Sequence, residues 1–251
     1  MELLPALIAA LILSGAYLFG GWFSRSDASR EFWERRRWIS AAAGVSVAYV
    51  FVDVLPELGA LQQVFTQAKS HAAMLFVENR IYVLALISFV VFYGLDHIVF
   101  AKRESTGGVS GELDSVYLLH LAGFAAYSGM IGYLLVERAQ RGWLALTVYT
   151  FVMAVHFLIV GHSLAEEHGL EQQRLSRLLL AGSVLAGWLL GATLPLSELA
   201  FARLFAILAG GVVITSLSHE LPGKRRGRFW PFCLGAAVFA LALLASEAAV
   251  G

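Results

Sequence analysis

Apolar runs of about 20 residues recur along the chain with only short polar segments between them, and no other feature limits the fold as strongly. A helix of about 20 apolar residues crosses a bilayer, and inside the hydrocarbon its backbone polar groups must bond within the protein. The runs predict eight transmembrane helices, at Leu3–Phe23, Trp38–Leu58, Ile81–Ala101, Ser115–Val136, Trp143–Ala165, Leu178–Leu196, Phe201–Leu217 and Phe229–Ala245. We therefore expect an all-α integral membrane protein.

The composition supports this fold class and limits the kinds of partner that the protein is expected to bind. Of 251 residues, 59% are hydrophobic and 14% are charged, which leaves too little polar surface for a water-soluble domain. The linkers are short, so residues 1–251 are expected to form a single transmembrane domain. A net charge of zero without a basic stripe argues against nucleic acid as a partner. The single cysteine, Cys233, excludes an intramolecular disulfide and CxxC zinc sites.

The basic residues predict the orientation in the membrane. Loops after the odd-numbered spans hold 13 of the 18 lysines and arginines, and the opposite loops hold 5. Because basic loops stay in the cytoplasm, both termini are expected on the extracytoplasmic side. We expect a bacterial inner (plasma) membrane, with the lipid bilayer as the main partner. A homodimer or an accessory protein stays open.

The second and seventh spans share a pattern of glycine and proline. Ala43–Val45 is followed by Asp53–Glu57 (DVLPE), and Ala209–Gly211 is followed at matching separation by His219–Gly223 (HELPG). The predicted topology makes these spans cross in opposite directions, as in the inverted repeats of many transporters. The alternative is that the two patterns are similar by coincidence, since glycine and proline are common in membrane helices.

These motifs, AAAGVSVAYVFVDVLPEL and LAGGVVITSLSHELP within eight spans, resemble the Zrt/Irt-like (ZIP) family of divalent-metal transporters. The resemblance implies an inverted-repeat bundle of eight helices with both termini outside. It also implies zinc or another divalent cation as the ion that is bound and moved. In that family, one motif in the fourth span and one in the fifth supply the side chains of the transport site.

The chain departs from the ZIP family at those two motifs. In Phe124–Gly129 only the glycine matches, and Ser128 stands where the family has glutamate. In His156–Gly161 the first histidine is kept, but the second histidine and both carboxylates are lost. A divalent cation in low dielectric needs anionic oxygens or several imidazoles to replace its water. The sequence therefore predicts that the central two-metal site is absent and that the resemblance supports fold more strongly than transport.

Other polar side chains lie within the spans, mostly in the half expected to face the cytoplasm. Such groups are costly in a bilayer and often mark a site, although histidines near a membrane surface also bond to water or headgroups. Asp96 is a candidate partner that orients a histidine, and Asp53 would lie at the outer mouth of a pathway. His162 and Glu166 are four residues apart on one helix face. The candidate metal-site residues are His156, Ser128, Asp53, Asp96, His97, His120, His162 and Glu166.

Three functions fit these residues. The first is a ZIP-like carrier that moves a divalent cation along a path lined by Asp53, Ser128, His156 and Asp96. The second is a non-transporting relative that acts as a membrane scaffold, sensor or accessory subunit. The third is an intramembrane zinc hydrolase, which ranks last because His156 and His162 are six residues apart and point to different sides. We therefore expect no enzyme activity.

Overall fold

The computed structural model describes residues 3–23, 36–67, 80–106, 115–167, 170–216 and 228–248, and these residues are almost entirely helical. Strands are absent from the described ranges. The elements are α1 (Leu3–Phe23), α3 (Arg36–Tyr49), the π-helical turn η1 (Val50–Val54), α4 (Leu55–Gln67), α5 (Arg80–Thr106), α6 (Ser115–Gln140), α7 (Trp143–Glu167), α8 (Leu170–Thr193), α9 (Glu198–Thr215) and α10 (Phe229–Ala248). Since α3, η1 and α4 are continuous, the described chain forms eight helical segments.

Every predicted span corresponds to one of these segments, and the prediction of an all-helical membrane protein is confirmed. Among the described residues, five stretches are long and apolar enough to cross a membrane: Ser40–Val64, Arg80–Ile98, Leu118–Gln140, Arg174–Thr193 and Glu198–Thr215. The apolar stretches Leu3–Phe19, Trp143–Leu158 and Phe229–Ala245 are shorter. Their helices α1, α7 and α10 are nevertheless 21, 25 and 20 residues long, which is enough for a crossing.

Four helical segments extend beyond their predicted spans by more than a turn. The second span was expected to end at Leu58 and the third at Ala101, but α4 continues to Gln67 and α5 to Thr106. The fourth span was expected to end at Val136, but α6 continues to Gln140, and α8 begins at Leu170 rather than Leu178. An apolar run marks only the part of a helix that lies in hydrocarbon. Polar residues with good helix propensity extend these helices beyond that part, and the extension of α6 places Arg138 within the helix.

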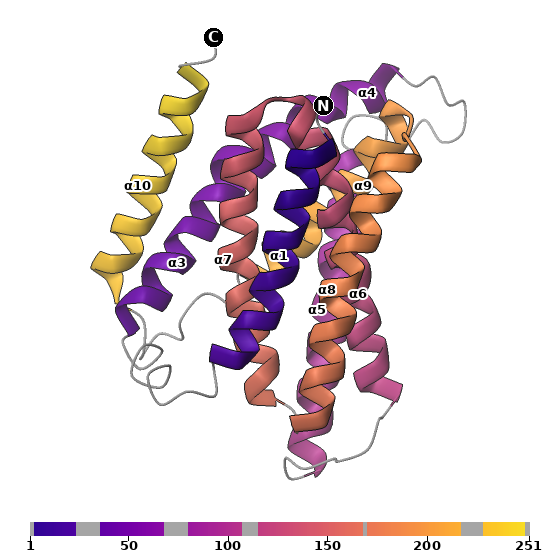
Figure 1. Cartoon of the computed structure of the whole chain (residues 1–251), viewed down its shortest axis with the longest axis vertical. Coiled ribbons are helices and arrows are strands. Elements are labelled where there is room, and N and C mark those ends of the chain that lie inside the picture. Colours follow the sequence, from indigo (N-terminus) through magenta and orange to yellow (C-terminus); the bar gives the residue numbers. More distant parts are fainter. Residues whose placement is uncertain are drawn as a thin grey trace.

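The helices run up and down the bundle, so the chain begins and ends at the same end (Figure 1). We call this the terminal end; it also holds α4 and the turn between α6 and α7. In that turn Gly142 has φ of 118°, a conformation that suits glycine, and its N–H donates to the Ala139 carbonyl. Which side of the membrane the terminal end faces stays a prediction from the basic residues.

Close backbone contacts define two helix pairs, α3 with α10 and α5 with α9. A Cβ atom at Gly44 would lie 2.1 Å from the Phe232 carbonyl oxygen, and one at Gly210 would lie 2.1 Å from the Ala85 carbonyl oxygen. Only glycine permits such an approach. Gly44 is six residues before the first π-helical residue, Val50, and Gly210 is six residues before Ser216, where α9 also becomes π-helical. The two pairs therefore meet at matching positions.

Neighbouring contacts repeat this match. A Cβ atom at Gly235 of α10 would lie 2.1 Å from the Ala41 carbonyl oxygen of α3. In the other pair, Ser88 of α5 donates to the Ile207 carbonyl of α9 at 2.6 Å. Ala41 and Ile207 each precede the glycine of their own helix by three residues, so the register is the same in both pairs.

The remaining helices, α1, α6, α7 and α8, pack around the centre of the bundle. Ser14 of α1 donates to the Ala181 carbonyl of α8 at 3.0 Å. A Cβ atom at Gly187 of α8 would lie 1.9 Å from the Gly129 carbonyl oxygen of α6. The largest fully buried side chains include Tyr17, Tyr127 and Phe157, so α1, α6 and α7 each contribute an aromatic ring to the core.

Candidate functional site

Helix α6 carries polar side chains at three levels, and each level contacts a different helix. His120 lies towards the end opposite the termini, Tyr127 and Ser128 lie in the middle, and Arg138 lies in the last turn. His120, Ser128 and Arg138 are all at most 5% exposed. Because buried polar groups need partners, we consider the contacts at these three levels as candidate functional sites.

At the middle level, four polar side chains are paired in two hydrogen bonds. The Ser128 hydroxyl donates to the Phe124 carbonyl at 2.7 Å and therefore accepts from the Tyr17 hydroxyl, 2.9 Å away. The Tyr127 hydroxyl lies 3.1 Å from Nε2 of His156. The Tyr17 ring is stacked on Phe157 with 4.2 Å between ring centroids. These partners come from α1, α6 and α7, and we call Tyr17, Tyr127, Ser128, His156 and Phe157 the central cluster.

The central cluster contains the two predicted residues Ser128 and His156, and both are almost fully buried. The Ser128 proton is committed to a carbonyl, and the remaining groups are neutral hydroxyls and one imidazole. A divalent cation would meet no carboxylate among these side chains, although it needs anionic or several imidazole ligands. The described geometry suits packing and hydrogen bonding better than metal binding.

Asp96 and His120 form the pair at the level opposite the termini. Nε2 of His120 lies 3.1 Å from Oδ1 of Asp96, which links α6 to α5. The histidine ring also packs edge-on against Phe124, with 4.8 Å between centroids. The interpretation of Asp96 as a residue that orients a histidine agrees with this contact, whereas a metal role for either residue stays a prediction.

The other predicted residues contribute less to this level. His97 is exposed and stacks on Tyr93 of its own helix, with 6.1 Å between ring centroids. The side chains of His162 and Glu166 lie outside the described residues. Among the residues whose placement is described, three or more His, Cys, Asp or Glu side chains never come together as a metal-ion group.

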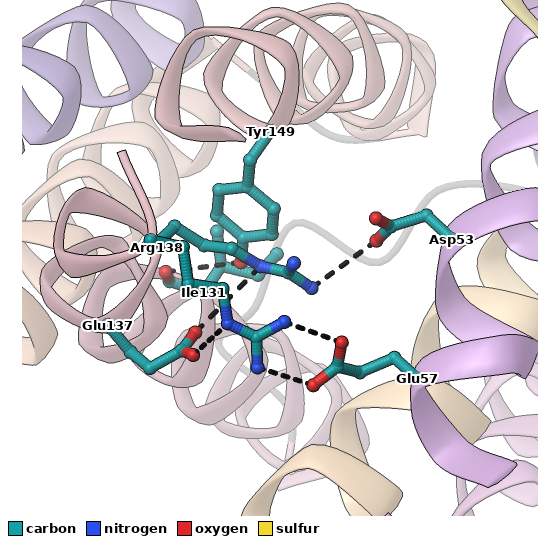
Figure 2. Close-up of polar contacts among 7 residues, drawn as sticks. Asp53, Glu57, Ile131, Glu137, Arg138 and Tyr149 are labelled. Carbon is teal, nitrogen blue, oxygen red and sulfur yellow. Dashed lines mark hydrogen bonds and ion pairs between the residues drawn. The ribbon is translucent and has the colours of Figure 1, made fainter. Parts of the chain in front are cut away.

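At the terminal end, Arg138 and Arg141 bind three carboxylates (Figure 2). Arg138 donates to Asp53 of η1 at 3.3 Å. Arg141, in the α6–α7 turn, binds Glu57 of α4 through two bonds of 2.5 and 2.6 Å and also binds Glu137. We call Asp53, Glu57, Glu137, Arg138 and Arg141 the ionic network.

Arg138 is the deepest member of the ionic network. It is 5% exposed, its guanidinium lies 5.5 Å from the centre of the Tyr149 ring, and its Nε atom faces Glu137 at 3.9 Å without a hydrogen bond. The Tyr149 hydroxyl in turn donates to the Ile131 carbonyl. A cation buried this deeply is tolerated because carboxylates and an aromatic face surround it.

Arg141 lies closer to water, with 38% of its side chain exposed. Hydrogen bonding to the Glu57 carboxylate raises the pKa of Arg141, which favours its charged form. Sequence reasoning placed both arginines in a loop and treated Asp53 as the mouth of a pathway. The signal that could have revealed the network was the spacing of its charges. Asp53 and Glu57 are four residues apart, and so are Glu137 and Arg141, and this spacing is typical of side chains on one helix face.

Apolar side chains separate the three levels. Phe124 lies between His120 and the central cluster, and Ile131, Leu134 and Leu135 lie on α6 between that cluster and Arg138. All four apolar side chains are at most 1% exposed. Asp53, Ser128, His156 and Asp96 therefore belong to three separate polar groups in this structure, rather than to one continuous polar path.

The fold and these contacts define an all-helical membrane protein with buried polar groups at three levels. In the comparisons with known proteins, no family model matches the chain, and the search of curated proteins found no match.

Proposed function

We propose that this chain is a ZIP-like membrane protein that keeps the inverted-repeat plan of a carrier but does not move divalent cations through its centre. The observation that carries the proposal is the central cluster. Its hydroxyls and imidazole pair with one another, Phe124 replaces the first expected histidine, and Ser128 replaces the expected carboxylate. Without anionic ligands, the cost of removing water from a divalent cation is not recovered.

The matching contacts of two helix pairs support the inverted-repeat plan. Exchanging α3 with α9 and α10 with α5 maps the close contact at Gly44 onto the one at Gly210. The π-helical residues Val50 and Ser216 exchange in the same way. In Figure 1, α3 rises towards the terminal end, whereas α9 starts there, which gives the opposite directions that an inverted repeat requires.

Contacts on the proposed symmetry axis agree with this plan. A twofold axis brings equivalent residues together, and two pairs fit that description. Ser14 and Ala181 each directly precede a glycine that is followed five residues later by another glycine, and they are hydrogen-bonded to each other. Tyr127 and His156 each lie five residues before a glycine in the two central helices, and they are also bonded.

Metal uptake by reconstituted vesicles tests the proposal. We expect vesicles that contain the protein to take up zinc, manganese and iron no faster than protein-free vesicles. A double variant, Phe124→His with Ser128→Glu, restores two missing ligands beside His156 and provides the matched control, because we expect it to gain zinc binding. Saturable uptake by the natural chain that is lost in His156→Phe would overturn the proposal.

A carrier with an altered metal route is the second candidate, and the Asp96–His120 pair favours it. A carboxylate bonded to an imidazole inside a bundle is a common arrangement around protein-bound metals. This candidate predicts metal uptake that falls at least tenfold in Asp96→Asn and is unchanged in His156→Phe. The same vesicle assay therefore separates the two candidates.

A further inference from the structure

The ionic network joins the η1–α4 segment to the last turn of α6 and to the α6–α7 turn. Packing alone would hold these parts together less firmly than the ion pairs do. Among the described residues, α4 packs against α5 and α9, and η1 also packs against α9. Their links to the last turn of α6 and to the α6–α7 turn are the ion pairs of Asp53 with Arg138 and of Glu57 with Arg141. The connection across the terminal end is thus made by long charged side chains.

The segment that carries Asp53 and Glu57 has a built-in point of bending. The π-helical turn covers Val50–Val54, and Pro56 follows two residues later. Proline lacks an N–H and removes a helical hydrogen bond, and π-helical turns weaken the regular ladder. Bending at such positions moves the following helix as a unit, and in this chain that helix is α4.

The two ion pairs differ in depth, which suits a contact that can be released. Arg141 and Glu57 keep 38% and 15% of their side chains exposed, so water can replace their bonds at small net cost. Arg138 and Asp53 lie deeper, at 6% and 23%. The outer pair can therefore part first, after which water reaches the inner pair.

We propose that the ionic network is a latch that holds η1 and α4 against the α6–α7 turn, and that this segment opens as a gate at the terminal end when the latch is released. The latch proposal does not depend on whether the protein transports metal ions, so it can fail or succeed independently of the proposed function. Opening would expose the residues next to Asp53, of which Val54 is 2% exposed in the latched state.

Cysteine accessibility in nanodiscs, which leave both ends of the bundle in contact with water, tests the latch. Val54→Cys is introduced into a Cys233→Ser background, and its rate of reaction with a membrane-impermeant maleimide is measured. We expect Arg141→Gln to raise this rate about threefold, as the small net energy of a partly exposed charge pair implies for a two-state equilibrium. Arg141→Lys keeps one charged bond and should give an intermediate rate.

Two controls separate opening from general loosening. Leu121→Cys reports on α6 towards the opposite end, where it is 6% exposed, and its rate should stay unchanged in Arg141→Gln. The exposed Arg203→Gln should change neither rate. An unchanged Val54→Cys rate in Arg141→Gln, or an equal rise at Leu121→Cys, would overturn the proposal.

Hydrogen exchange gives a readout that needs no introduced cysteine. In Arg141→Gln, backbone amides of residues 50–58 should exchange about threefold faster than in the natural chain. Amides around Gly129 and Gly132, where α6 packs closely on α8, should keep their rates. Equal exchange at residues 50–58 in both proteins would contradict the latch.

Discussion

At the centre of the bundle, the hydroxyl groups of α6 bind another hydroxyl and an imidazole, whereas at its last turn the same helix carries Arg138 among carboxylates. The ionic network instead brings three carboxylates to two guanidiniums and keeps Arg141 partly exposed. Both regions bury polar atoms, but only the second contains charges that can exchange their partners for water.

This difference indicates which region of the molecule can rearrange. A hydrogen-bonded cluster inside packed aromatic rings resists rearrangement, because buried groups that lose a hydrogen bond do not regain one from bulk water. Ion pairs near water have small net energies and separate more easily. Substitutions in the ionic network and in the central cluster therefore test whether the two regions differ in this way.

The largest effect is expected for Arg138→Met. This change leaves Asp53 and Glu137 without their buried cation, and we expect the free energy of unfolding in detergent–SDS mixtures to fall by about 3 kcal/mol. Arg203→Met, at an exposed position of α9, should change it by no more than about 0.5 kcal/mol. A loss in Arg138→Met as small as in this control would mean that the network contributes little.

A smaller loss is expected for Tyr127→Phe in the central cluster. The change removes the hydroxyl that contacts His156, and the loss of one hydrogen bond costs about 1 kcal/mol. Tyr93→Phe is the matched control, since Tyr93 is exposed on α5. If Tyr127→Phe were as stable as the natural chain, the bond between Tyr127 and His156 would contribute nothing to stability.

The smallest effect is expected for Arg141→Gln. Because this arginine is partly exposed, we expect a loss of about 0.7 kcal/mol at low salt, shrinking as added salt screens the pair. The loss in Arg138→Met should depend much less on salt, because Arg138 is buried. Unfolding free energies at two salt concentrations measure both, and equal salt dependence would show that the two arginines share one environment.

Hydropathy predicted the eight helical segments because a membrane helix must be apolar over its whole crossing. It missed the last turn of α6, since Glu137, Arg138 and Gln140 are polar and yet continue the helix. It could not pair Asp53 with Arg138, which are 85 residues apart in sequence. Charge spacing on each helix was visible, but only the packing of the helices shows which faces meet.

The absence of metal ligands at Phe124 and Ser128 stays a prediction that depends on the resemblance to the ZIP family. The bonds of Ser128 with Tyr17 and of His156 with Tyr127 were not predicted. Tyrosines in apolar spans look like ordinary core residues in a sequence. Asp96 was expected to orient a histidine, and the structure places it against His120.

The most direct test of the account is a calorimetric titration of zinc into the purified natural chain and into His156→Phe. We predict the same titration curve for both proteins, because we propose that the central cluster binds no metal, and a tighter curve for the Phe124→His and Ser128→Glu double variant. One zinc bound per natural chain and lost in His156→Phe would contradict the account.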